Sequence, residues 1–241
     1  MFSYQREPKP MSRAAFTHLE LSQWLTNQYQ VIYDCCISLT NLTTLHVVQD
    51  PDRQLLRRQP FVQHWIHLYT FHLNTSLAKL FVDSRNQHWS FPELLAQFRN
   101  KDIGADFSRY YAVNRSRFPP WDNLWKSDDD VMAGVSEAER LLADPTHQQK
   151  TARVRKHRDE LSAHSDFIAT PPSSYCDLRD LVELAKKIHD HFTRNINGTA
   201  TSFMVSPIYG IDPLLKPWLD KQGTIRQDLN ALASESGIEE S

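Results

Sequence analysis

A run of basic residues leads into an arginine and a histidine in the second half of the chain, where residues 155–166 read RKHRDELSAHSD. Arg158 and His164 stand six positions apart, which on a straight helix is about 9 Å along the axis and about 120° around it. Because the arginine side chain is long, both heads can reach one phosphate at the end of a helix. A histidine can take or give a proton in phosphodiester cleavage, and an arginine can hold the phosphate oxygens. RNA supplies its own 2′-hydroxyl nucleophile, so this chemistry requires no metal and no cofactor.

The neighbouring residues fit two interpretations. Arg153, Arg155, Lys156 and His157 would form a basic approach surface for RNA, and Asp166 would fix the imidazole of the histidine. The same charges also suit an ordinary solvated helix end, because cations near a helix C-terminus interact favourably with its dipole. Spacing alone leaves both interpretations open.

The segment RDELSAHSD resembles the signature of the HEPN superfamily, in which an arginine and a histidine lie near the end of one bundle helix, and it looks closest to the AbiU2-like branch. The upstream segment LNTSLAKLFVDSRNQHWSFPELL resembles the helix end, loop and short Ser-led helix of the same family. Together the two segments cover roughly residues 60–195. The matching residues are Arg158, Asp159, Leu161, Ala163, His164, Ser165 and Asp166, with Leu77, Leu80, Asp83, Ser90, Leu94 and Leu95 upstream.

This resemblance implies a helical homodimer in which the Arg/His ends of two subunits meet in one cleft and form a metal-independent endoribonuclease. Members of this kind often act as toxins or phage-defence effectors, which implies an antitoxin or defence partner. By position, Arg158 would bind phosphate, His164 would act as general acid or base, and Asp159 would orient a neighbour. The alternative is a non-catalytic dimerisation or RNA-binding module, in which His164 is hydrogen-bonded across the interface.

Long proline-free stretches with apolar residues every three or four positions predict the elements that would position these residues. One amphipathic helix is expected over roughly residues 16–48 and a second from Pro60 onward, joined by a short link and therefore antiparallel. Later helix starts are predicted where Ser or Thr is followed three residues on by an acid or amide, and Asn197-Gly198 predicts a stop. These starts are at Ser90, Ser127, Thr146 and Ser174.

The expected fold is all-α: an up-and-down bundle of four to five main helices, and the resemblance implies that it pairs as a dimer. We assign residues 1–15 to an N-terminal arm, 16–198 to the bundle and 199–241 to a C-terminal extension with a polar tail. Residues 101–125 form an irregular, aromatic insertion, expected to pack as a cover over the bundle. The extension is expected to be loop-like to Gln222, with a weak helix from Thr224. No pair of strands is expected.

The composition bounds the class of protein. Of 241 residues, 40% are hydrophobic and 23% charged, which is normal for a globular domain with a core. The net charge of −2 gives no overall attraction to nucleic acid, so RNA affinity would need a local patch. No apolar run is long enough for a membrane span and no signal peptide is recognised, so a cytoplasmic protein is expected. Cys35, Cys36 and Cys176 are expected to be small buried thiols, and the scattered histidines, such as His64 and His67, ordinary partly exposed side chains.

Overall fold

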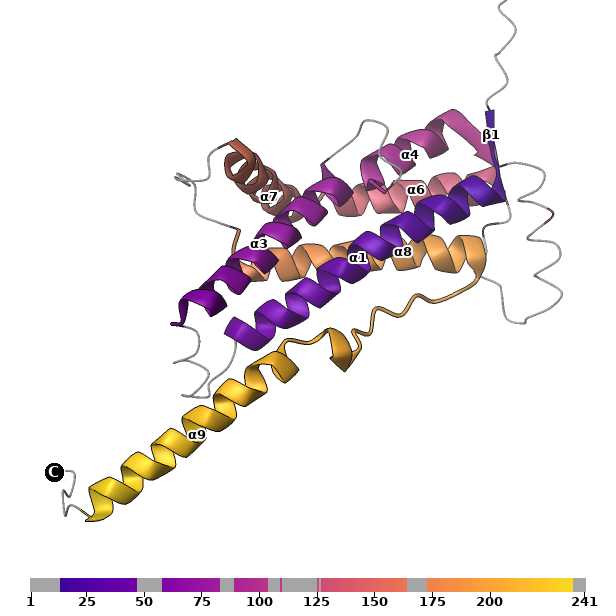
Figure 1. Ribbon diagram of the computed structural model, residues 1–241. Coiled ribbons are helices and arrows are strands. Elements are labelled where there is room, and N and C mark those ends of the chain that lie inside the picture. Colours follow the sequence, from indigo (N-terminus) through magenta and orange to yellow (C-terminus); the bar gives the residue numbers. More distant parts are fainter. Residues whose placement is uncertain are drawn as a thin grey trace, which may run out of the picture.

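The computed structural model describes residues 14–46, 58–82, 89–103, 109, 125, 127–163 and 173–235. Helices hold 82% of these residues, so the expectation of an all-α protein is confirmed. None of the described helices is both long and apolar enough to cross a membrane. The elements are β1 (Ala14–Phe16), α1 (His18–His46), α3 (Pro60–Phe81), α4 (Phe91–Asn100), β2 (Lys101–Ile103), α6 (Asp128–Leu142), α7 (Pro145–Ala163), α8 (Tyr175–Asn197), a 3-10 turn (Pro207–Tyr209) and α9 (Asp212–Glu235) (Figure 1).

The two long helices α1 and α3 lie side by side and run antiparallel, as their sequences predict (Figure 1). Leu45, at the end of α1, packs in one cluster with Val62, at the start of α3. Further along the pair, Ser38 Oγ of α1 lies 2.9 Å from His72 Nδ1 of α3. Helix α8 packs against both, and α7 packs against α3 and α8.

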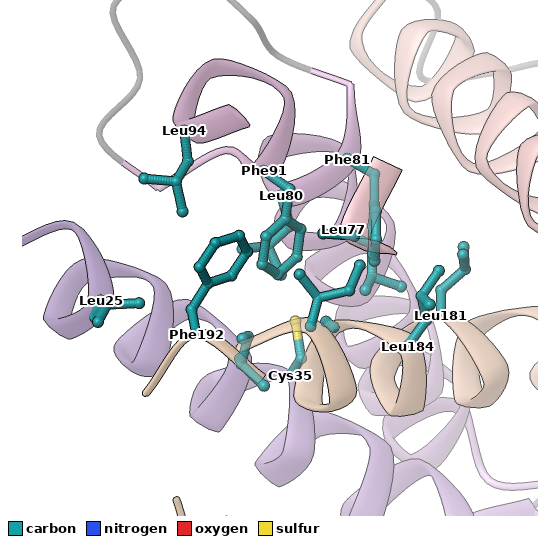
Figure 2. Close-up of a cluster of buried hydrophobic side chains, with 14 of the residues drawn as sticks. Leu25, Cys35, Leu77, Leu80, Phe81, Phe91, Leu94, Leu181, Leu184 and Phe192 are labelled. Carbon is teal, nitrogen blue, oxygen red and sulfur yellow. The ribbon is translucent and has the colours of Figure 1, made fainter. Parts of the chain in front are cut away.

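The main core forms where α1, α3, α4 and α8 turn their apolar faces toward one another. Figure 2 shows ten labelled side chains of this cluster, and they come from all four helices. Burying each Leu or Phe contributes about 1.5–3 kcal/mol relative to leaving it in water, so this cluster dominates the stability of the bundle. The labelled residues are Leu25, Cys35, Leu77, Leu80, Phe81, Phe91, Leu94, Leu181, Leu184 and Phe192.

Trp125 is the one aromatic residue of the insertion that lies within the described residues. Its side chain is buried and meets Phe98 and Phe192 edge to face, and the backbone N–H of Trp125 donates to the Asn195 carbonyl at 3.0 Å. Gly134 makes room for this ring, because a Cβ there would lie 2.0 Å from Trp125 Cζ2. Trp125 therefore packs as the predicted cover, whereas residues 104–108 and 110–124 lie outside the described part of the chain.

Three of the four predicted helix caps are confirmed and one is wrong. The side chains of Ser90, Ser127 and Ser174 each accept a hydrogen bond from the backbone N–H three residues on, and Gly198 ends α8 at φ 66°. Helix α7 does not start from Thr146. Its cap is Asp144, whose Oδ1 accepts from the N–H of Thr146 at 2.9 Å and of His147 at 3.3 Å. A carboxylate satisfies the free N–H groups well, and Pro145 suits the first helical position.

Two further expectations are corrected near the ends of the described chain. Strands β1 and β2 form a short parallel pair in which Ala15 lies opposite Asp102, where no strands were expected. Helix α9 begins at Asp212 rather than Thr224 and continues through Pro217. The reason is tertiary: Ile211 and Leu215 are buried against Leu45 and Val62, and such packing outweighs local propensity.

The cysteines differ from one another. Cys35 and Cys36 are buried as expected, and burial raises the pKa of the Cys36 thiol to about 11. Cys176 is exposed, which corrects the expectation that all three are buried. It lies in the first turn of α8, and α8 turns the neighbouring Asp177 and Leu178 inward instead.

Candidate functional site

The candidate site lies on α7, a helix with few apolar contacts of its own. Among its described side chains, Val154 and His157 are the buried ones. The helix contacts α3 and α8, and ion pairs join it to α8: Arg153 Nε and a terminal guanidinium nitrogen lie 3.0 and 2.6 Å from the two carboxylate oxygens of Asp177. Lys150 Nζ donates to Asp180 at 2.6 Å. These contacts fix the helix that carries Arg158.

Arg158, the predicted phosphate ligand, is paired with its sequence neighbour Asp159. Arg158 Nε lies 2.9 Å from Asp159 Oδ1, and a terminal guanidinium nitrogen lies 2.8 Å from the same oxygen. The arginine side chain is 22% exposed, so its head remains within reach of solvent. The carboxylate therefore holds one edge of the guanidinium.

The three predicted RNA-binding cations are not equivalent. The guanidinium of Arg153 is engaged by Asp177, which gives it a structural task. Arg155 and Lys156 are far more exposed, at 64% and 62%. Their nearest described carboxylates, one turn along the helix, lie at 3.9 Å and 4.0 Å, which is longer than a hydrogen bond. Arg155 and Lys156 are therefore the better placed of the three to meet a phosphate backbone.

His157 corrects the expectation of a continuous basic surface. Its side chain is buried between α7 and α3, and no described residue makes a hydrogen bond with Nδ1. Burial lowers the pKa of His157; the carboxylate of Glu160 opposes this effect and the nearby His67 reinforces it. A histidine of this kind is neutral at neutral pH. Its spacing of three from Val154 is the sequence signal that places it on the buried side of α7.

His164 and Asp166, the other two predicted site residues, lie outside the described residues. Helix α7 is described to Ala163, the residue immediately before the histidine. The described geometry therefore covers Arg158 and Asp159 and leads up to His164.

The arrangement suits anion binding at the C-terminal half of α7. Within the described ranges, no three His, Cys, Asp or Glu side chains come together in a way that would hold a metal ion. The chemistry present is a guanidinium oriented by a carboxylate, with two exposed cations within one turn. Comparisons with protein-family models, with curated proteins and with solved structures return no match for this chain.

Proposed function

We propose that the protein is a metal-independent endoribonuclease of the HEPN type, in which Arg158 binds the scissile phosphate and His164 is the general acid or base. The observation that carries the proposal is the pairing of Arg158 with Asp159 on a helix anchored to α8. A carboxylate that pairs with a guanidinium fixes its orientation on the helix, and an oriented guanidinium is the group that proteins use to recognise a phosphate. Such preorganisation is what stabilises developing charge in a transition state.

In this mechanism the 2′-hydroxyl of RNA attacks the adjacent phosphorus and expels the 5′-oxygen of the next nucleotide. His164 takes the proton of the 2′-hydroxyl or gives one to the departing oxygen. Arg158 balances the charge that builds on the phosphate oxygens. Asp166 orients the imidazole, and Arg155 and Lys156 attract the RNA backbone.

The proposal includes a homodimer, and the exposed face of α3 supports it. Lys79 is the one formally charged residue in the sequence of α3. The exposed positions of α3 include Leu68 and Phe71, at 46% and 39% exposure, beside the exposed His64 and His67. Depletion of charge and enrichment in aromatic residues are typical of the core of a protein interface. An uncharged face can also meet its own copy without like-charge repulsion, and α3 contacts α7, so pairing here brings two α7 helices near each other.

The test of catalysis is cleavage of RNA by the purified protein in EDTA. We expect His164→Ala and Arg158→Ala each to lower the rate by about 10²–10⁴-fold, the usual contribution of a positioned acid–base or charge-stabilising group. Arg179→Ala is the matched control, since Arg179 Nε lies 3.2 Å from Oδ1 of its own neighbour Asp180 on α8. A parent protein without metal-free cleavage, or equal losses for Arg158→Ala and Arg179→Ala, would contradict the proposal.

A second candidate is a non-catalytic dimerisation or RNA-binding module. The observation that favours it is the same Arg158–Asp159 pair, because a carboxylate 2.8 Å from the guanidinium competes with phosphate for it. In this case His164→Ala and Asp166→Asn should destabilise the protein equally, by about 1–3 kcal/mol, through loss of a buried hydrogen bond. RNA would bind without being cut.

The dimer has its own test by light scattering. Leu68→Glu and Phe71→Glu should convert a dimer to a monomer, because each places a charge in an apolar contact. Leu19→Glu serves as control, since Leu19 is 77% exposed at the start of α1. A wild-type monomer at micromolar concentration would exclude the dimer. Any toxin or phage-defence role, with an antitoxin or other defence partner, rests on this same proposal.

A further inference from the structure

An open cavity of about 640 Å³ lies where α4, α6 and α7 meet the last turn of α3. Helices α4 and α7 each line the cavity with one face, because on each helix the lining residues follow the pattern i, i+3, i+4, i+7. This pattern runs from Pro92 to Arg99 on α4 and from Gln148 to Arg155 on α7. This volume falls within the range of small-molecule sites, about 300–1,000 Å³. The cavity is formed by packed helices of the described chain.

The walls of the cavity are mainly apolar. Phe81 and Leu95 come from α3 and α4, and Leu142 comes from α6. Three alanines keep the space open where larger side chains would fill it: Ala96, Ala143 and Ala152, one each from α4, the end of α6 and α7. All three are exposed toward solvent. An apolar groove with small residues at its sides accepts the apolar body of a ligand without displacing protein atoms.

The charged residues of the cavity set the charge of that ligand. Arg99 and Glu139 neutralise each other in a two-point ion pair, in which Arg99 Nε lies 2.8 Å from Glu139 Oε1. Arg155 is the remaining cation. Its carboxylate neighbour on α7, Asp159, lies 3.9 Å away and also pairs with Arg158. The balance of the lining is therefore one positive charge at the edge of an apolar groove.

We propose that this cavity binds a small amphipathic anion, an organic carboxylate or sulfonate with an apolar body. The body packs against Leu95 and Leu142, and the anionic group pairs with Arg155. A cationic ligand is disfavoured because the carboxylate of Glu139 is already engaged by Arg99. The site shares Arg155 with the RNA proposal, but ligand binding here requires neither His164 nor cleavage, so the two can be tested apart.

The first measurement uses 8-anilinonaphthalene-1-sulfonate, a fluorescent amphipathic anion, with the full chain at neutral pH. We expect saturable binding to one site per chain, and displacement of the probe by decanoate. Decanol has the same apolar body without the charge, so it should displace the probe roughly tenfold less well, as expected for loss of one charge-assisted contact. Equal displacement by decanoate and decanol would overturn the assignment of charge.

Variants then locate the site. Arg155→Gln should weaken decanoate binding roughly tenfold and abolish its advantage over decanol, whereas Arg179→Gln on α8 should change neither. Ala152→Trp and Ala96→Trp each fill the groove from a different helix and should abolish probe binding. Circular dichroism and thermal melting identify any variant that fails to fold, and the other one then decides. Unchanged binding in a folded tryptophan variant, or no saturable binding by the wild type, would overturn the proposal.

Discussion

Helices α7 and α8 are neighbours in the same bundle, yet they are held by different forces. Helix α8 buries a continuous apolar stripe that includes Leu181, Ile188 and Phe192. Among the described side chains of α7, only Val154 and His157 are buried; the helix contacts both α3 and α8, and ion pairs join it to α8. The helix proposed to bind phosphate thus depends on ion pairs for part of its contact with a neighbour that is fixed by apolar burial. Ion pairs are weakened when salt screens them or when their carboxylates are protonated, whereas an apolar contact has no charge to screen or titrate.

The largest loss of stability is expected from a substitution in the apolar stripe of α8. Phe192 is fully buried and stacks on Phe98, with ring centroids 5.6 Å apart and an interplanar angle of 7°. Phe192→Ala should lower the free energy of unfolding by about 3–5 kcal/mol, through lost transfer energy and a residual cavity. Val154→Ala on α7 should cost clearly less, because two methyl groups are removed instead of a ring. Denaturant titration measures both, and an equal or larger loss for Val154→Ala would contradict the comparison.

The next effect is a pH dependence located in α8. His189 is buried, and burial lowers its pKa from 6.5 to about 4. The unfolded chain therefore binds a proton between these values while the folded chain does not, so stability is full above pH 6.5 and falls as the pH drops toward 4. The loss is on the order of 2–3 kcal/mol.

His189→Leu should flatten this pH dependence. Urea unfolding at pH 7.5 and pH 4.5 measures it, with the exposed His64→Leu as control. Some slope should remain, because burial also lowers the pKa of His72 and His157. An unchanged slope in His189→Leu would show that His189 is protonated in the folded protein.

The contrast between α7 and α8 also explains which parts of the fold could be predicted from the sequence. Helix α8 was predictable from end to end because its cap, apolar stripe and glycine stop are all local signals: Ser174, Leu181 and Gly198. The docking of α7 was not predictable, because Arg153 meets Asp177 across 24 positions of sequence. The sequence around a basic residue does not show whether a distant carboxylate will form an ion pair with it in the folded protein.

Two errors have the same origin in long-range packing. His157 was assigned to a basic surface, but its spacing from Val154 turns it toward α3. Helix α9 is expected from the sequence to begin at Thr224. Ile211 and Leu215 pack against Leu45 and Val62, however, and the helix begins at Asp212 and continues through Pro217. Of the candidate site, the chemistry of Arg158 and Asp159 was predictable because the two residues are adjacent.

An intermediate effect is expected at the junction of the two helices. Asp177 caps α8 through Ser174 and pairs with Arg153 of α7. Asp177→Asn should lower the free energy of unfolding by about 1–2 kcal/mol, since a charge-assisted pair and part of a cap are lost together. Hydrogen exchange should rise in α7 more than in α8. The comparable change Glu137→Gln, in an exposed pair within α6, should do little.

The contribution of Asp177 also has a defined pH range. Burial, the largest influence, raises the pKa of this carboxyl, but the hydrogen bonds from Arg153 and Ser174 together outweigh it and leave the pKa below 3.8. Its stabilising contribution is therefore complete above pH 3.8 and is lost as the pH falls through the lower, folded value. Added exchange in wild-type α7 already at pH 5 would contradict this.

The smallest expected effect comes from Lys150 and Asp180, the second pair between α7 and α8. The side chains are 15% and 33% exposed, and the hydrogen bond from Lys150 is the main cause that lowers the pKa of Asp180. A double-mutant cycle with Lys150→Ala and Asp180→Ala should give a coupling of about 0.2–1 kcal/mol, and 1 M salt should reduce it. The pair Lys186–Glu183 within α8 is the control, because its removal leaves α7 docked. If Lys150 and Asp180 show no coupling while Asp177→Asn still loosens α7, the docking of this helix rests on the Arg153–Asp177 pair and the two buried side chains Val154 and His157. The orientation of Arg158 would then depend in part on the ion pair of Arg153, five residues away, and variants at Asp177 should change phosphate binding without altering Arg158 itself.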